Sequence, residues 1–204
     1  MPQVRGEIHG QKFEDENANG VKDEEDKGLE GWTIILSSSE ENQTTQTNEN
    51  GLYWFTDLDP DTYTVTEELK INWLQTTPNP QPIEIQSGSN ITGIDFGNFR
   101  FGRIFGTKFN DLNADGVWQE PDEPPLADWN ITLTLPNSTV IWNLTDQDGK
   151  YSFRNLLAGT HIVSEVHQLG WNQTKPINNG TYEVLISSNS QFVNRNFGNH
   201  LLIA

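Results

Sequence analysis

The chain of 204 residues carries 29 acidic and 12 basic side chains, a formal net charge of −17, and no cysteine. This acidity argues against nucleic acid and anionic membrane surfaces as partners, because both attract clustered Lys and Arg. No apolar run approaches the ~18 residues of a membrane span, so no direct membrane insertion is expected. An extracellular chain without disulfides needs another source of robustness, such as a bound metal or a different cross-link.

The sequence contains two copies of one pattern. Ile8–Phe13 returns as Ile104–Phe109, and Phe96-Gly97-Asn98 returns as Phe197-Gly198-Asn199. Each copy reads as about seven short strands with alternating apolar residues, and Asn50-Gly51 and Asp148-Gly149 mark hairpin turns. No stretch keeps a helical period. We therefore predict an all-β fold of two tandem immunoglobulin-like sandwiches, residues 1–100 and 101–204.

An acidic loop follows the first predicted strand of each copy. Oxygen-bearing side chains stand at loop positions 1, 3 and 5, a Gly stands at position 6, and further candidate ligands follow at position 7 (backbone carbonyl), position 9 and the loop end. This spacing predicts a structural Ca²⁺ site in each copy; the alternative is an Asn/Asp-rich turn with solvated acids. The candidate ligands are Asp15, Asn17, Asn19, Val21, Asp23 and Asp26 in the first copy, and Asp111, Asn113, Asp115, Val117, Gln119 and Glu123 in the second, where one inserted residue favours Glu123 over Asp122.

Strand alternation points three polar side chains of each copy toward the core. Lys12 shares the parity of Ile8 in the first strand, and the same reasoning applies to a Glu in a later strand and an Asn in the last one. A buried charge costs several kcal/mol unless it is paired. One purpose for such a set is an intramolecular isopeptide bond, in which a neutral Lys attacks the Asn side chain while the Glu shuttles protons. The alternatives are an unreacted buried cluster or a parity misjudged by one residue. The two sets are Lys12, Glu67 and Asn98, and Lys108, Glu165 and Asn199.

Seven Asn-x-Thr sequons are scattered over both copies, more than the roughly two expected by chance. They predict N-glycosylation, with compositional accident as the alternative. The acceptor residues are Asn42, Asn90, Asn130, Asn137, Asn143, Asn172 and Asn179.

The motifs resemble the B-type repeats of Gram-positive surface adhesins. Gly106–Asp111, the loop Asp111–Glu123 and Asp148–Phe153 carry the likeness, which extends over nearly the whole chain. The resemblance is to two types: the Cna B-like fold of collagen adhesins, which implies isopeptide bonds, and the B domains of serine–aspartate-repeat proteins, which implies calcium loops. His161 departs from the Tyr usual at that position, which the first copy keeps as Tyr63.

These observations predict a non-enzymatic structural or adhesive stalk module on the outside of a cell, part of a surface protein, S-layer or filament. Its expected partners are other repeats of the same protein or neighbouring surface subunits, together with glycans or host proteins. One alternative is a carbohydrate-binding accessory module, with Trp54, Trp118 and Trp142 as exposed stacking candidates. Another is a filament subunit that donates its apolar end Leu201-Leu202-Ile203 as a strand. The four histidines form no spaced metal cluster or catalytic triad.

Overall fold

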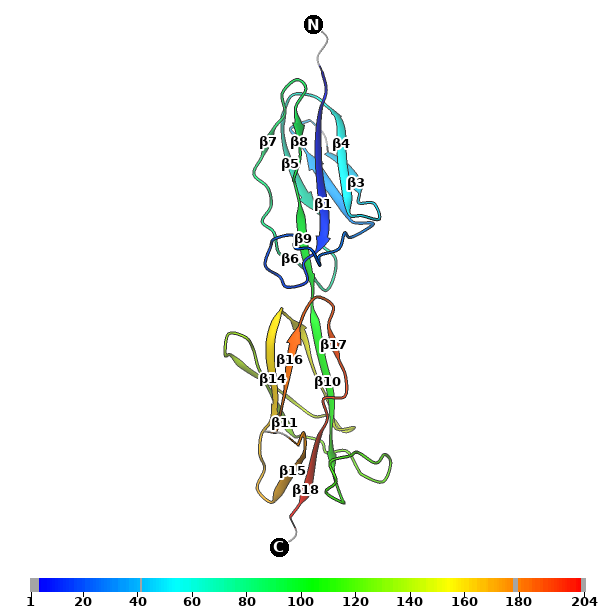
Figure 1. Ribbon diagram of the computed structural model, residues 1–204, viewed down its shortest axis with the longest axis vertical. Coiled ribbons are helices and arrows are strands. Elements are labelled where there is room, and N and C mark those ends of the chain that lie inside the picture. The colour runs from blue at the N-terminus through cyan, green and yellow to red at the C-terminus, as the bar shows by residue number, and fades with distance from the viewer. Residues whose placement is uncertain (1–3, 41, 178–179, 203–204) are drawn as a thin grey trace. The chain divides into compact units, whose positions relative to one another are not determined.

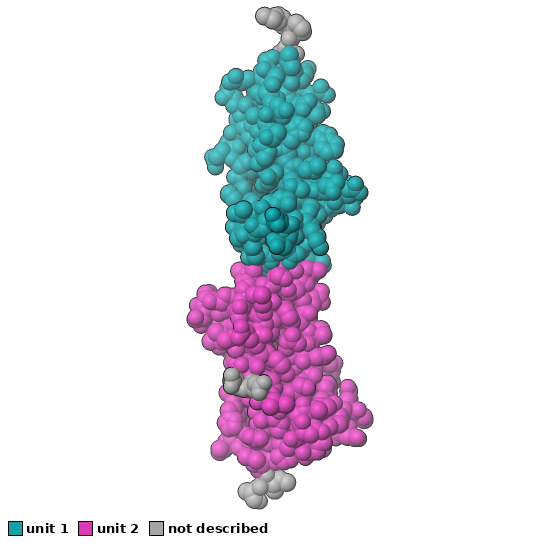
Figure 2. Space-filling view, viewed as in Figure 1, with its two compact units in different colours: residues 1–100 teal, residues 101–204 magenta. Residues whose placement is uncertain are grey.

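The computed structural model describes residues 4–40, 42–177 and 180–202. The chain divides into two compact units, Met1–Arg100 and Phe101–Ala204 (Figures 1 and 2). Each described element is a strand, and none is a helix long and apolar enough to span a membrane. The prediction of an all-β chain with two tandem sandwiches is confirmed.

The first unit packs two sheets against each other. One has the strand order β4-β1-β9-β6, with β8 pairing along β1, and the other has the order β3-β2-β5-β7. β1 and β9 lie parallel, so the first and last strands of the unit are direct neighbours. The strands are β1 (Gly6–Glu14), β2 (Thr33–Ser37), β3 (Asn42–Gln46), β4 (Leu52–Leu58), β5 (Thr62–Glu67), β6 (Trp73–Gln75), β7 (Ile83–Glu84), β8 (Asn90–Ile91) and β9 (Phe96–Arg100).

The second unit repeats this topology. Its sheets run β13-β10-β18-β15, with β17 pairing along β10, and β12-β11-β14-β16. The strands are β10 (Gly102–Asn110), β11 (Asn130–Thr134), β12 (Val140–Leu144), β13 (Lys150–Leu156), β14 (Gly159–Glu165), β15 (Trp171–Lys175), β16 (Thr181–Ile186), β17 (Gln191–Phe192) and β18 (Phe197–Leu201). The sequence predicted about seven strands per copy, fewer than the structure describes, because two-residue strands such as β7, β8 and β17 are too short to show an alternation.

Each unit has a core of its own between its sheets. In the first, Ile8, Ile34, Val65 and Phe96 are fully buried, and the alternating partners of Ile34 and Val65 face outward. This is the period-2 pattern that a strand with one buried face requires. The same pattern places a lysine of β1 in the core of the first unit and a lysine of β10 in that of the second.

In both units a buried threonine holds the backbone just before the first strand of the second sheet, β2 or β11, by two hydrogen bonds. The Thr145 hydroxyl accepts a hydrogen bond from the Trp129 backbone N–H at 2.9 Å and donates to the Leu126 carbonyl at 2.7 Å. Thr47 makes the same pair of bonds with Trp32 and Leu29. Each hydroxyl therefore satisfies a donor and an acceptor that burial would otherwise leave without a partner.

We expect Thr145→Val to lower the free energy of unfolding of the second unit by about 1–3 kcal/mol. Valine keeps the shape of threonine but leaves the buried Trp129 N–H and the half-buried Leu126 carbonyl without this partner. Thermal and urea unfolding followed by circular dichroism measures the change. Thr139→Val is the matched control, because Thr139 is exposed in the same hairpin; an equal loss in both variants would contradict the role assigned to the buried hydroxyl.

Candidate functional site

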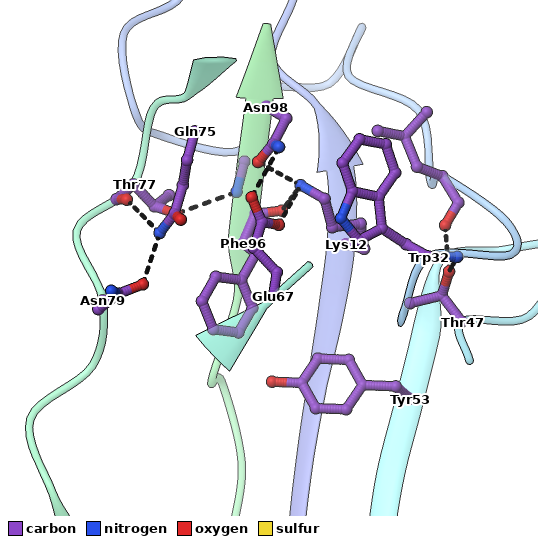
Figure 3. Close-up of polar contacts among 12 residues, drawn as sticks. Lys12, Trp32, Thr47, Tyr53, Glu67, Gln75, Thr77, Asn79, Phe96 and Asn98 are labelled. Carbon is purple, nitrogen blue, oxygen red and sulfur yellow. Dashed lines mark hydrogen bonds and ion pairs between the residues drawn. The ribbon is translucent and has the colours of Figure 1, made fainter. Parts of the chain in front are cut away.

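The inward lysine, glutamate and asparagine of the first unit meet in its core. Lys12 comes from β1 and Asn98 from the neighbouring β9, while Glu67 reaches across from β5 of the facing sheet (Figure 3). The Lys12 and Asn98 residues are fully buried, and Glu67 is 8% exposed. The structure thus brings together the three residues that strand parity singled out.

The three side chains contact one another in a closed triangle. The Lys12 Nζ donates to the Asn98 Oδ1 at 2.5 Å, and the Asn98 Nδ2 donates to the Glu67 Oε1 at 2.7 Å. The Lys12 Nζ also lies 3.0 Å from the Glu67 Oε2, an ion pair. Amine, amide and carboxyl are therefore in mutual contact, with the amine on the oxygen side of the amide and the carboxyl on its nitrogen side.

The second unit holds the same triangle. The Lys108 Nζ donates to the Asn199 Oδ1, the Asn199 Nδ2 donates to the Glu165 Oε1 at 2.7 Å, and the Lys108 Nζ lies 3.0 Å from the Glu165 Oε2. Lys108 and Asn199 are fully buried. Two copies with the same contacts show that the arrangement is a property of the fold.

Burial favours the neutral forms of both lysines and of Glu165. It lowers the pKa of Lys12 and of Lys108 to about 8, against the opposing attraction of Glu67 and Glu165. Burial also raises the pKa of the Glu165 carboxyl, and the charge of Lys108 opposes that change. The lysines are thereby moved toward the uncharged amine, which is the nucleophilic form.

A tryptophan covers each buried lysine, which the sequence reasoning did not assign. The Lys12 Nζ lies 4.7 Å from the ring centre of Trp32, and the Lys108 Nζ lies 4.3 Å from that of Trp129. Trp73 and Trp171 pack edge-on against these two rings at 5.2 and 5.5 Å. The sequence signal for this role is the recurrence of both tryptophans in the two copies, Trp32 and Trp73 as Trp129 and Trp171.

The acidic loop of the first unit is wrapped by its own side chains. Asp15 accepts the backbone N–H groups of Asn19 and Gly20 at 3.1 and 2.7 Å, and the Asn19 Oδ1 accepts that of Val21 at 2.7 Å. Ala18 and Gly20 have positive φ angles of 58° and 75°, which produce the sharp turn. The oxygens at positions 1, 3 and 5 therefore turn toward the inside of the loop.

The second loop has the same pattern of hydrogen bonds, but the carboxylate and the amide at positions 5 and 9 are exchanged. In the first loop the amide of Asn19 (position 5) donates to the Asp23 carboxylate (position 9) at 2.8 Å. In the second the amide of Gln119 (position 9) donates to the Asp115 carboxylate (position 5) at 2.7 Å. Carboxylate and amide have changed places, so each ligand set keeps three carboxylates and two amides: Asp15, Asp23, Asp26 with Asn17, Asn19, and Asp111, Asp115, Glu123 with Asn113, Gln119.

The late carboxylates occupy equivalent places in the two loops. Asp26 accepts the backbone N–H groups of Glu16 and Asp23, and Glu123 accepts those of Leu112 and Gln119. These donors stand at loop positions 2 and 9 in both copies. Asp122 is exposed, whereas Glu123 is 3% exposed. The structure therefore places Glu123 in the loop, as the inserted residue suggested.

The donor set of each loop fits a hard cation. Carboxylate and amide oxygens, with the carbonyl of Val21 or Val117, are the ligands that Ca²⁺ takes. Among the described residues, no three His, Cys, Asp or Glu side chains gather closely enough to hold a metal ion by themselves. The fit therefore depends on the mixed set, in which amides and a backbone carbonyl complete the carboxylates.

In each unit the acidic loop is joined to the buried triangle through the last strand. The Asp15 N–H donates to the Asn98 carbonyl, and the Asp111 N–H donates to the Asn199 carbonyl, both at 2.9 Å. Burial raises the pKa of Asp111, but hydrogen bonds from the Thr174 side chain and the loop backbone outweigh it and hold that pKa below its ordinary value. Asp111, the candidate ligand at position 1 of the second loop, is thus ionised and hydrogen-bonded to the backbone of Asn199, whose side chain contacts Lys108.

The sequons differ in accessibility. Asn42, Asn90, Asn137 and Asn172 are exposed, Asn130 and Asn143 are half-buried, and Asn179 lies outside the described residues. The Thr145 of the Asn143 sequon is buried and hydrogen-bonded.

The three tryptophan candidates differ in exposure. Trp54 and Trp142 are exposed. The expectation for Trp118 is wrong, because its ring stacks on Phe109 at 5.8 Å and is half-buried.

Comparisons with known proteins match both units. The family model described as "SdrD B-like domain" matches residues 7–96 and 103–199. The chain is 32% identical over 204 residues to the serine-aspartate repeat-containing protein D of Staphylococcus aureus (strain MW2), a match that covers 88% of the chain and 15% of that protein. It is 30% identical over 178 residues to the serine-aspartate repeat-containing protein F of Staphylococcus epidermidis (strain ATCC 12228 / FDA PCI 1200), covering 79% of the chain and 11% of that protein.

Two solved structures align over most of the chain with low identity. The Bacillus anthracis TIE protein aligns with 97% of this chain and 34% of its own, at 18% identity and a TM-score of 0.43. GBS52, the minor pilin of Streptococcus agalactiae, aligns with 98% of this chain and 97% of its own, at 13% identity and a TM-score of 0.40.

Proposed function

The chain belongs to the family of SdrD B-like domains, and on that premise we propose that its two units are load-bearing stalk modules, each held by a covalent Lys–Asn cross-link and a calcium-filled loop. The predicted resemblance to B-type repeats is confirmed, and the chain is a structural module of a cell-surface protein. It spans only 15% of the length of the Staphylococcus aureus relative. What the whole protein adheres to is therefore outside the proposal.

The observation that carries the proposal is the buried triangle of Lys, Glu and Asn, present with the same contacts in both units. β1 and β9 are the first and last strands of the first unit, and Lys12 and Asn98 lie on them. A bond between these side chains joins the points where tension enters and leaves the unit. Force then passes through the cross-link, and the strands between are not pulled apart.

The bond-forming step balances with the groups present. The neutral Lys12 amine attacks the side-chain carbonyl carbon of Asn98, and a new Nζ–Cγ bond forms. Glu67, which contacts both nitrogens, takes a proton from Nζ and delivers it to Nδ2, the Cγ–Nδ2 bond breaks, and ammonia leaves. Nothing is oxidised or reduced, and the Glu67 carboxyl is restored.

Calcium would act on the loop, which has no apolar core of its own. Asp15, Asn17, Asn19, Asp23 and Asp26, with the Val21 carbonyl, would hold the ion in the first unit, and the corresponding set would hold it in the second. Binding to the folded state alone adds stability through mass action. Because Asp15 is bonded to the backbone of Asn98, the ion would also fix the end of the last strand.

The assignment as a surface stalk module also indicates which partners and which glycan acceptors to expect. We propose other repeats of the parent protein or neighbouring surface subunits as partners, and the exposed Asn42, Asn90, Asn137 and Asn172 as the acceptors open to a glycan. The carbohydrate-binding alternative keeps only Trp54 and Trp142 as exposed aromatic rings. In the strand-donation alternative, Leu201 is the last residue of β18 and Ile203 lies outside the described residues.

We expect the intact mass of the purified chain to fall short of its sequence mass by two molecules of ammonia, one per unit. Glu165→Gln should recover one of them, because the second triangle loses the group that moves protons. Mass spectrometry of the intact chain and of a protease digest measures this, and the digest should contain a Lys108 peptide joined to an Asn199 peptide. Glu183→Gln is the matched control on an exposed position of β16 and should keep both losses. A wild-type chain of full sequence mass would rule out the cross-links.

We expect Asp23→Asn to weaken calcium binding by the first loop by about tenfold or more, since affinity follows the number of carboxylate ligands. The double variant Asn19→Asp/Asp23→Asn copies the arrangement of the second loop and should recover most of the affinity. Calorimetric titration with Ca²⁺ and the rise in melting temperature measure both. Glu25→Gln removes an exposed charge beside the loop and is the control. A melting temperature that neither Ca²⁺ nor chelator changes would contradict the metal assignment and leave the cross-link untouched.

A further inference from the structure

β12 of the second unit is an edge strand with an apolar outer face. It is the terminal strand of the order β12-β11-β14-β16, with β11 as its neighbour among the strands that the structure describes. A strand at such an edge presents unpaired backbone N–H and C=O groups, and soluble proteins usually protect it with charges, proline or a bulge. β12 has the sequence Val-Ile-Trp-Asn-Leu and carries none of these protections.

The surroundings of β12 are uncharged as well. No Asp, Glu, Lys or Arg occurs from Trp129 to Thr145, a run that covers all of β11, the turn and β12, in a chain whose net charge is −17. Two copies of so acidic a chain repel each other over most of their surfaces. The β11–β12 hairpin is a place where that repulsion is weakest.

The side chains on the outer face of β12 are large and exposed. Ile131 and Leu133 of β11 are fully buried and pair with Asn143 and Ile141, so Val140, Trp142 and Leu144 point to the opposite, outer face. Their exposed fractions are 56%, 64% and 47%. Their neighbours on this face of β11 are the polar Thr134, Thr132 and Asn130, so the apolar stripe is confined to β12, beside its free backbone edge.

The equivalent strand of the first unit has a different surface. β3 pairs with β2 as β12 pairs with β11, but its sequence is Asn-Gln-Thr-Thr-Gln, and Glu40 and Glu41 precede it in the chain. Thr44 pairs with Ile35 and is exposed at the position that Trp142 occupies in β12. The apolar edge is therefore a feature of the second unit and is not required by the fold.

We propose that β12 is a docking edge for a second copy of this chain, with the two β12 strands pairing antiparallel about Trp142. Trp142 is the middle residue of the five, so a two-fold axis there sets Trp142 against its counterpart and Val140 against Leu144 of the other copy. All outer-face pairs are then apolar, and two four-stranded sheets merge into one. Such a self-complementary contact is the isologous type that closes as a dimer.

The choice of occupant follows from charge and symmetry. A basic partner would gain nothing from a hairpin without acidic residues, and this edge differs in that respect from most of the chain. The outer face of β12 reads Val, Trp, Leu, so it presents apolar residues at the same positions when a second copy runs in the opposite direction. The sequon at Asn137 lies in the exposed turn of the hairpin, outside β12, so a glycan there is compatible with pairing. The sequon at Asn143 lies on β12, but Asn143 is on the inner face and half-buried, its Oδ1 accepts the Ser152 N–H, and its Thr145 is buried, so pairing requires this acceptor to be unmodified.

Sedimentation velocity of the purified 204-residue chain over a range of concentrations tests the proposal. We expect the wild type to move from monomer to dimer as its concentration rises, and Trp142→Lys to remain monomeric because it places two like charges opposite each other in the pair. Thr44→Lys introduces the same charge on β3 and should leave the dimer intact. Trp142 is exposed, so the melting temperature of Trp142→Lys should match that of the wild type.

A second readout identifies the edge itself. The chain has no cysteine, so Trp142→Cys introduces a single thiol that meets its counterpart at the two-fold axis, within the Cα separation that a disulfide accepts. Mild oxidation should give a covalent dimer, whereas Thr44→Cys should stay monomeric. A wild type that is monomeric at all concentrations would overturn the proposal. So would a dimer that Trp142→Lys leaves unchanged, or a Trp142→Cys variant that forms no more cross-link than Thr44→Cys.

Discussion

The structure depends on one unusual feature, a lysine amino group buried in the hydrophobic core of each sandwich. Removing such a group from water costs several kcal/mol, and only close partners offset that cost. Lys12 has four such partners: a carboxylate at ion-pair distance, an amide oxygen, the Phe96 carbonyl and the face of Trp32. A paired but unreacted lysine of this kind contributes little net stability, since apolar residues of similar volume would serve as well. In the proposed cross-link the advantage would come from the reaction of the amine, because the product amide would be neutral and fixed.

The same constraint explains where the acidic loops attach. Each loop leaves the end of the strand that carries the lysine, and its first acid bonds to the backbone of the asparagine. A frayed strand end would admit water to the triangle and restore the ordinary pKa of the lysine. An ion held by the loop would keep that end closed, although Asp15 itself favours a charged Lys12. Neutralising Asp15 with a cation and keeping water out therefore act on the amine in the same direction.

Much of this was predictable from sequence because period 2 is a strict geometric rule. Parity placed a Lys, a Glu and an Asn inward in both copies, and the structure brings each set together. Loop spacing located the acids, and the inserted residue indicated Glu123. Parity says nothing about what lies above a side chain, so the stacking of Trp32 and Trp129 on the lysines was missed. Trp118 was predicted to be exposed, but its ring stacks on that of Phe109, a contact that the sequence pattern does not show. The two-residue strands carry no pattern that a sequence can show.

The differences between the copies are as informative as their likeness. Positions 5 and 9 of the loops have exchanged carboxylate and amide, which preserves both the charge of the ligand set and the hydrogen bond across it. Such an exchange is expected where the set acts as a unit, because either single change alone would alter the charge. β3 and β12 differ without compensation: the backbone pairing is kept while the outer face passes from polar to apolar. An uncompensated change that exposes a tryptophan lowers solubility and adds nothing to the core. Within one chain whose two units share the strand topology and the buried triangle, the apolar edge is best explained by a contact that the second unit makes and the first does not.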